Sequence, residues 1–136
     1  MLPQTVIMFQ RRAFVWREMS HAFVQHRFPT SDGADAFVAP ACGALHALVA
    51  NHVVHGRVIF PGAGYLEMAR AAAVVAASAT STELQGVFFL QPLAVELPDL
   101  NVACVVSDGR FDVRSSNLVI DDVEFVDMTL HCSGGL

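Results

Sequence analysis

The chain has 136 residues and a formal net charge of −5, and 54% of its residues are hydrophobic while 15% are charged. This length allows one domain with one core, and the composition is too apolar for a disordered chain. A negative chain without a cluster of Lys and Arg is not expected to bind nucleic acid. The low share of charged residues predicts that a partner covers part of the apolar surface.

The cysteines indicate the compartment. Cys42, Cys104 and Cys132 show no C-x-x-C spacing, which is typical of reduced thiols and predicts a cytoplasmic protein. The apolar run over residues 71–79 is far shorter than the ~20 residues that a membrane span needs. Near the N-terminus, basic residues follow the apolar stretch instead of preceding it, which is the wrong order for a signal peptide. We therefore expect neither a membrane segment nor export.

The first part of the chain is expected to lie outside the core. Residues 1–19 are predicted to form a linker anchored by Phe14, Val15 and Trp16, and the domain proper is predicted to cover residues 20–136. Residues 31–35 contain Ser, Asp and Gly and are predicted to form a loop. A short strand is predicted for residues 36–38.

An apolar run over residues 45–50 leads to His52, and residues 45–54 are predicted to be a strand that carries this histidine. Pro61 and the glycine after it suit the start of a helix, which is predicted for residues 63–79. The only charges of this helix, Glu67 and Arg70, are three residues apart and can form an ion pair. Because the helix is otherwise apolar all round, we expect it to be buried, with alanines that let a sheet approach closely.

The joint between this strand and the helix is the predicted place of the chemistry. His52 can exchange a proton near neutral pH, and partial burial on an apolar strand would favour its neutral form and so a free base. Gly56 would let backbone approach a ligand closely. Unpaired N–H groups in the first turn of the helix would polarise a carbonyl whose oxygen gains charge. The alternative is that a histidine in an apolar context has a structural role.

Two further histidines are assigned structural roles. On a strand, His55 would point to the face opposite His52, and His131 would lie in the closing strand. His46, His52 and His55 are close in sequence, but no Cys or second carboxylate stands at ligand spacing from them. No metal site is therefore expected.

Short strands are predicted after the helix, over residues 84–90, 93–97, 101–106, 111–114 and 123–132. Pro92 and Pro98 separate the first of them from their neighbours. Asp108 and Gly109 between two β-rich runs predict a hairpin. One long buried helix with several antiparallel strands predicts an α+β fold, in which a curved antiparallel sheet wraps around a central helix.

His52, Gly56 and Pro61 fit the pattern H-x-x-x-G-x-x-x-x-P, and residues 61–69 read P-G-A-G-Y-L-E-M-A. This combination resembles the dehydratase domain of modular type I polyketide synthases and animal-type fatty acid synthases. Residues 130–136 are similar to the H-A-x-G-x-L that closes the family's first half-domain. Residues 21–24 are similar to its opening H-P-L-L, with Ala22 in place of proline, and residues 9–12 resemble the end of the linker from the preceding acyltransferase. The resemblance implies a hotdog fold, as the first half of a double hotdog.

The resemblance also implies a reaction. The family removes water from a β-hydroxyacyl thioester, carried on the phosphopantetheine arm of an acyl carrier protein, and no directly bound cofactor is implied. His52 would be the general base, while Gly56, Pro61 and Tyr65 would shape the substrate site or contact the acyl chain. For Tyr65, core packing is the alternative. The implied partners are the C-terminal hotdog half, the acyl carrier protein and the other domains of a homodimeric synthase.

The family's general acid is an aspartate of the second hotdog, within a D-x-x-x-Q or D-x-x-x-H motif. The aspartates of the second half of this chain do not fit that context: Asp99, Asp108, Asp112, Asp121, Asp122 and Asp127. The 136 residues are therefore expected to be inactive alone. Two interpretations remain open: one half of an active dehydratase, or a non-catalytic hotdog module with an acyl-binding or assembly role in which His52 is vestigial. The completeness of the motif disfavours a dimeric hotdog thioesterase.

Overall fold

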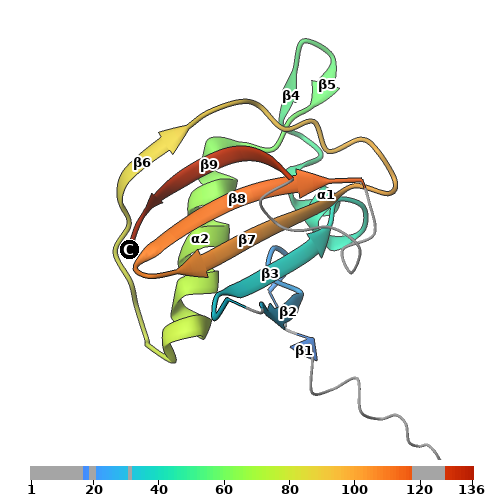
Figure 1. Cartoon of the computed structure of the whole chain (residues 1–136). Coiled ribbons are helices and arrows are strands. Elements are labelled where there is room, and N and C mark those ends of the chain that lie inside the picture. Colours follow the sequence, from blue (N-terminus) through green and yellow to red (C-terminus); the bar gives the residue numbers. More distant parts are fainter. Residues whose placement is uncertain (1–16, 19–20, 31, 118–127) are drawn as a thin grey trace, which may run out of the picture.

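A curved antiparallel sheet wraps around one long helix in the computed structural model, which describes residues 17–18, 21–30, 32–117 and 128–136 (Figure 1). The sheet has seven strands in the order β1-β2-β3-β7-β8-β9-β6. These strands are β1 (Arg17–Glu18), β2 (His26–Pro29), β3 (Asp35–Pro40), β6 (Gln85–Phe89), β7 (Asn101–Ser107), β8 (Arg110–Ser116) and β9 (Thr129–Gly135). The α+β arrangement predicted from the sequence is thus the one observed.

Two smaller parts lie between β3 and the long helix. The short helix α1 (Ala44–Val49) is followed by the hairpin of β4 (Val53–Val54) and β5 (Arg57–Val58), which stands clear of the sheet in Figure 1. The long helix α2 (Gly62–Ala77) then crosses the concave face of the sheet. No helix in the described part of the chain has the length and hydrophobicity to cross a membrane.

Helix α2 begins one residue before the predicted residue 63 and ends at Ala77 instead of residue 79. Pro61 precedes it in an extended conformation (φ −74°, ψ 154°), and Ser78 closes it in the left-handed region with its N–H directed at Val74 and Val75 carbonyls. The face toward the sheet is rich in small residues: Gly64, Tyr65, Met68, Ala69, Ala71, Ala72 and Ala73 are buried. The predicted ion pair of Glu67 and Arg70 forms with N···O distances of 2.8 and 2.9 Å. The glycines and alanines let the sheet close over the helix.

Gly64 is required by packing, and its replacement is our first test. A Cβ atom at this position would lie 2.9 Å from the Cε2 and Cζ atoms of the buried Phe60 ring. We therefore expect Gly64→Ala to lower the free energy of unfolding by about 1–3 kcal/mol, the usual cost of overpacking. Gly62→Ala is the matched control, because its Cβ would meet the Phe89 ring at an ordinary 3.6 Å. Urea denaturation measures both variants, and equal stabilities would contradict the packing argument.

The hairpin between β7 and β8 was predicted correctly. Ser107 pairs with Arg110, so the turn consists of Asp108 and Gly109 alone. Both turn residues have positive φ values, 51° and 73°. Asp tolerates this region and Gly occupies it freely, so an Asp-Gly turn matches the twist of the two strands.

Three sequence predictions need correction. Residues 45–54 are not a strand, because residues 44–49 form α1, in which Leu45 and Val49 are buried at the i, i+4 spacing of a helix. A short apolar run does not distinguish a buried helix from a strand. Residues 93–97 form a single bridge, between Ala94 and Ile59, instead of a strand. The last strand runs to Gly135 instead of ending at residue 132.

Other predictions lie partly or wholly outside the described residues. The anchor residues Phe14, Val15 and Trp16 and the domain start near Ser20 are among them, as are residues 123–127 of the predicted last strand. Within the predicted linker, Arg17–Glu18 forms β1 and pairs with β2. The predicted strand over residues 36–38 is present and longer, as β3.

Candidate functional site

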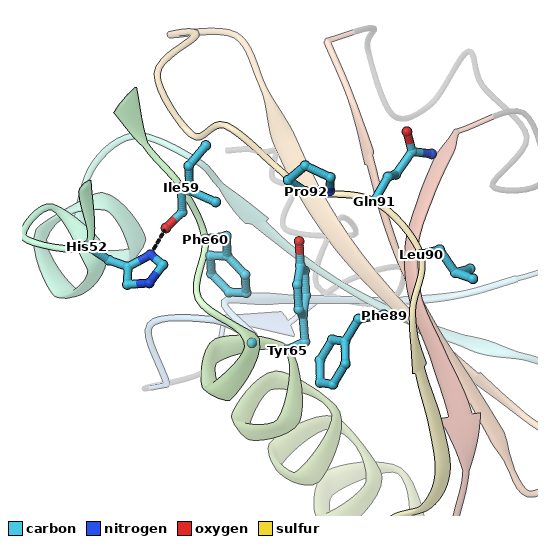
Figure 2. Close-up of a pocket in the computed structure, with 9 residues that line it drawn as sticks. His52, Ile59, Phe60, Tyr65, Phe89, Leu90, Gln91 and Pro92 are labelled. Atoms are coloured by element: carbon cyan, nitrogen blue, oxygen red, sulfur yellow. Dashed lines mark hydrogen bonds between the residues drawn. The ribbon is translucent and has the colours of Figure 1, made fainter. Parts of the chain in front are cut away.

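An open cleft of about 360 Å³ lies where the start of α2 faces the end of β6. Figure 2 shows the residues that line it: His52, Ile59, Phe60, Gly62, Tyr65, Phe89, Leu90, Gln91 and Pro92. They come from the loop before β4, the segment between β5 and α2, the start of α2, and the end of β6 with the residues after it. Most of these walls are apolar, so the cleft suits a hydrocarbon chain. The structure thus brings two of the predicted site residues, His52 and Tyr65, into one cleft.

His52 is held by Ile59, the residue that follows strand β5. Its Nδ1 atom lies 2.7 Å from the carbonyl oxygen of Ile59, and the Ile59 N–H donates to the His52 carbonyl at 3.0 Å. A carbonyl oxygen only accepts, so Nδ1 must carry the proton. In the neutral ring this leaves Nε2 with its lone pair free. The geometry therefore presents Nε2 as the basic atom.

The environment of His52 differs from the one predicted. The side chain is exposed, and it lies in the loop between α1 and β4 rather than on an apolar strand. Its main-chain N–H donates to the Val49 carbonyl at 2.9 Å, so the end of α1 fixes the start of this loop. The Ile59 carbonyl, and not burial, therefore fixes the orientation of the His52 ring.

The start of α2 offers a positive end to the cleft. The Gly64 N–H bends back to the Pro61 carbonyl at 2.8 Å, while no side chain in the described part of the chain caps this helix. Gly62 and Ala63 precede the first intrahelical bond, and their N–H groups have no partner among the described residues, so they can donate to a ligand. Gly62 itself lines the cleft. These N–H groups and the helix dipole favour an oxygen that gains negative charge.

Gly56 and His55 form the tip of the β4–β5 hairpin. His55 has φ 51° and Gly56 has φ 78°. A tight turn with positive φ values favours glycine, so the turn accounts for glycine at position 56. Neither residue is among those that line the cleft, and apart from its chain neighbours no described residue lies within 4 Å of the position that a Gly56 Cβ would take. The prediction that His55 lies on the strand face opposite His52 was wrong, because His55 lies in this turn. Glu96 anchors the hairpin by accepting from Arg57 at 3.0 Å and from the Val58 N–H at 2.9 Å.

His131 shapes the far wall of the cleft, which the sequence did not indicate. Its Nδ1–H donates to the Gln91 carbonyl at 3.1 Å, and its Nε2 accepts from the Ser115 hydroxyl at 2.7 Å. Its own carbonyl accepts from the Leu90 N–H at 2.8 Å. Burial lowers the pKa of His131, which agrees with a neutral ring. The side chain is therefore a support for residues 90–92.

Asp127 and His131 happen to show the D-x-x-x-H spacing of the family's acid motif. Asp127 lies outside the described residues. His131 is 4% exposed and uses both ring nitrogens in the bonds described above. Among the residues that the structure describes, no three His, Cys, Asp or Glu side chains converge to hold a metal ion.

Tyr65 stands in the middle of the cleft residues. Its ring packs between Phe60 and Phe89, with centroid distances of 5.0 and 6.0 Å. The residue is 4% exposed, and its hydroxyl has no hydrogen-bond partner within the described part of the chain. Burial, with a smaller effect of Cys132, raises the pKa of this hydroxyl above its usual value of 10.0.

The raised pKa of Tyr65 predicts how the fold responds to alkali. Because the folded-state pKa lies above that of the unfolded chain, the contribution to stability is complete below about pH 10 and is lost as the pH rises further. Tyr65 is the single tyrosine of the chain, so ultraviolet absorbance of tyrosinate reports on it alone. We expect tyrosinate to appear only as the fold is lost, as judged by circular dichroism. Titration near pH 10 with the fold intact would contradict the burial argument.

Comparison with known proteins agrees with this fold. A family model described as "Polyketide synthase dehydratase domain" matches residues 21–118. Polyketide synthase PksM of Bacillus subtilis (strain 168) is 29% identical over 115 residues, which cover 77% of this chain and 3% of that protein.

Solved structures of dehydratases share the fold. A variant of the GphF dehydratase has a TM-score of 0.69 at 22% identity, covering 88% of this chain and 44% of that one. The dehydratase domain of the polyketide PpsC from Mycobacterium tuberculosis has a TM-score of 0.64 at 18% identity, covering 85% and 43%. The chain thus spans less than half of each of these structures and a small fraction of PksM.

Proposed function

The chain belongs to the polyketide synthase dehydratase domain family and has its hotdog fold, and from this premise we propose that it supplies the general base of a dehydratase. The proposed reaction removes water from a β-hydroxyacyl thioester on an acyl carrier protein and gives the α,β-unsaturated thioester. The observation that carries the proposal is the bond between His52 Nδ1 and the Ile59 carbonyl, which leaves Nε2 free in the cleft.

In the proposed mechanism, Nε2 of His52 removes a proton from the α-carbon. The electron pair that is released is delocalised toward the thioester carbonyl, whose oxygen gains negative charge. The free N–H groups of Gly62 and Ala63 are suitable donors for this oxygen. The β-hydroxyl then leaves as water with a proton from an acid, and the α,β double bond forms. The acid is proposed to come from the C-terminal half of the domain.

The remaining site residues have supporting roles in this proposal. Pro61 sets the extended approach to α2, so that the first N–H groups reach the cleft. Gly56 allows the tight turn between β4 and β5, and β5 leads directly to Ile59, which orients His52. No cofactor is needed beyond the phosphopantetheine arm of the carrier protein, which would enter through the open side of the cleft.

The C-terminal hotdog half is the proposed partner at the edge of the sheet. Strand β6 is an edge strand that pairs only with β9 in the described sheet. Beside its free edge, Phe88, Phe89 and Leu90 are 64%, 56% and 53% exposed. An apolar edge strand of this kind favours pairing with another strand. We further propose the acyl carrier protein and the other domains of a dimeric cytoplasmic synthase as partners.

A direct assay tests the proposed function. The complete dehydratase domain, meaning residues 1–136 followed by a C-terminal half that carries the acid, is incubated with a β-hydroxyacyl carrier protein. Mass spectrometry of the acyl group is expected to show loss of one water. Binding of the acyl carrier without any dehydration would instead support the alternative, a non-catalytic acyl-binding module with a vestigial His52.

A further inference from the structure

We infer that the Tyr65 hydroxyl makes this cleft selective for acyl chains that carry an oxygen substituent beyond the carbons that react. The inference rests on the proposed function and concerns the same cleft. It assigns to Tyr65 a specificity-determining hydrogen bond, rather than a general apolar contact with the substrate.

The hydroxyl is a costly group at this position unless it binds something. Tyr65 is 4% exposed, and no described residue accepts from or donates to its oxygen. Its ring neighbours, Phe60 and Phe89, offer only apolar contact at this distance. Phenylalanine would fill the same space without burying an unbonded polar atom. A group that costs stability in a ligand cleft is expected to have a use there.

The position of Tyr65 decides which part of the substrate it can meet. His52 is bonded to Ile59, the next residue is Phe60, and the Phe60 ring packs on Tyr65 at 5.0 Å. In Figure 2, Phe60 accordingly lies between His52 and Tyr65, and the Tyr65 hydroxyl points away from α2 toward Pro92. Because a phenyl ring separates the two, an acyl chain whose α-carbon meets His52 would reach Tyr65 with more distant carbons.

The chemistry of the hydroxyl defines the class of chain. A protonated phenol donates one hydrogen bond and accepts others, so a hydroxyl or keto oxygen on the chain would satisfy it. A plain alkyl chain would fill the cleft and leave the phenol unbonded. A site built to bond an oxygen discriminates strongly against an analogue that lacks it, because the buried group then stays unpaired.

The test compares two kinds of substrate in the complete dehydratase domain. The probes are the pantetheine thioester of a β-hydroxydecanoyl chain and analogues with a second hydroxyl on the δ, ε, ζ or η carbon. For the wild type, we expect at least one analogue to have a kcat/KM about tenfold above the plain chain, the effect of one bond to a buried group. Tyr65→Phe should remove this preference, because a higher KM for the oxygenated chain brings its kcat/KM down to that of the plain chain in the same variant.

Two controls separate a binding role from a structural one. Phe89→Leu changes the cleft wall without removing a hydroxyl, so it should alter both substrates by similar factors and keep the preference. Tyr65→Phe should melt at the same or a higher temperature than the wild type, whereas a structural hydroxyl would make it melt lower. A preference that survives in Tyr65→Phe, or a wild type without preference across the panel, would overturn the inference.

The failure of this inference is distinguishable from failure of the proposed function. If the wild type dehydrates none of the thioesters, the proposed function is wrong, but binding still tests Tyr65. Residues 1–136 have one tyrosine, so the part of the ultraviolet difference spectrum on binding that is lost in Tyr65→Phe reports on the Tyr65 hydroxyl. The oxygenated chains should shift this spectrum and bind more tightly than the plain chain, and equal spectra and affinities would refute the role.

Discussion

Replacement of His52 by alanine should lower kcat of the complete dehydratase domain by roughly 10²–10⁴-fold, the usual effect of losing a general base. The side chain is exposed and its only described side-chain bond goes to the Ile59 carbonyl, so the core is not involved. The variant is therefore expected to keep its melting temperature within a few degrees. Steady-state turnover of a β-hydroxyacyl thioester, with circular dichroism as the folding check, measures both effects.

A second histidine serves as the matched control. His55 is three residues away, also exposed, and lies at the tip of the hairpin with φ 51°. His55→Asn keeps a residue that tolerates this conformation and removes the imidazole. It should retain most of the turnover. If His55→Asn loses as much activity as His52→Ala, or if His52→Ala keeps nearly wild-type activity, the assignment of the base is wrong.

Residues 1–136 expressed alone should show no dehydration and should associate in solution. Dehydration needs an acid as well as a base, and the acid is proposed to lie in the C-terminal half. Association follows from the free edge of β6, where Phe88, Phe89 and Leu90 are all more than half exposed. Light scattering gives the size, and a carrier-bound β-hydroxyacyl substrate gives the activity. A monomer with clear turnover would contradict both expectations.

Two variants of the isolated residues 1–136 test the cause of association and the source of any activity. Phe88→Lys places a charge beside the free edge and should reduce association, as charges do on natural edge strands. Asp127→Asn tests whether Asp127, which has the D-x-x-x-H spacing to His131, is the acid. If the isolated chain were active and this substitution abolished the activity, the acid would lie in this half of the domain.

The long helix and the β7–β8 hairpin were predictable because local chemistry determines them. Pro61 and Gly62 mark the start of α2, and the turn of Asp108 and Gly109 has the positive φ values that its sequence favours. Helix α1 was not predicted, because a run of six residues, five of them apolar, is too short to show a periodicity that separates a helix from a strand. The single bridge at Ala94 depends on its distant partner Ile59, which local sequence does not reveal.

The site was predictable in part for the same reason. The spacing of His52 and Pro61 identified the joint that forms one side of the cleft, and Tyr65 follows one turn into the helix. The partner that orients His52, the Ile59 carbonyl, is a backbone group with no signature of its own. The support of Gln91 by His131 joins positions that are 40 residues apart, and it arises only from the folded sheet.

Determining the tautomer of His52 is the measurement that most directly tests whether this residue is the base. Histidine labelled with nitrogen-15 in the complete domain, with His52→Ala to assign the signals, distinguishes Nδ1–H from Nε2–H by chemical shift. Since Nδ1 lies 2.7 Å from the Ile59 carbonyl, the neutral ring should carry its proton on Nδ1 and show an unprotonated Nε2. A neutral His52 that carries its proton on Nε2 would have no lone pair facing the substrate, and would contradict its assignment as the base.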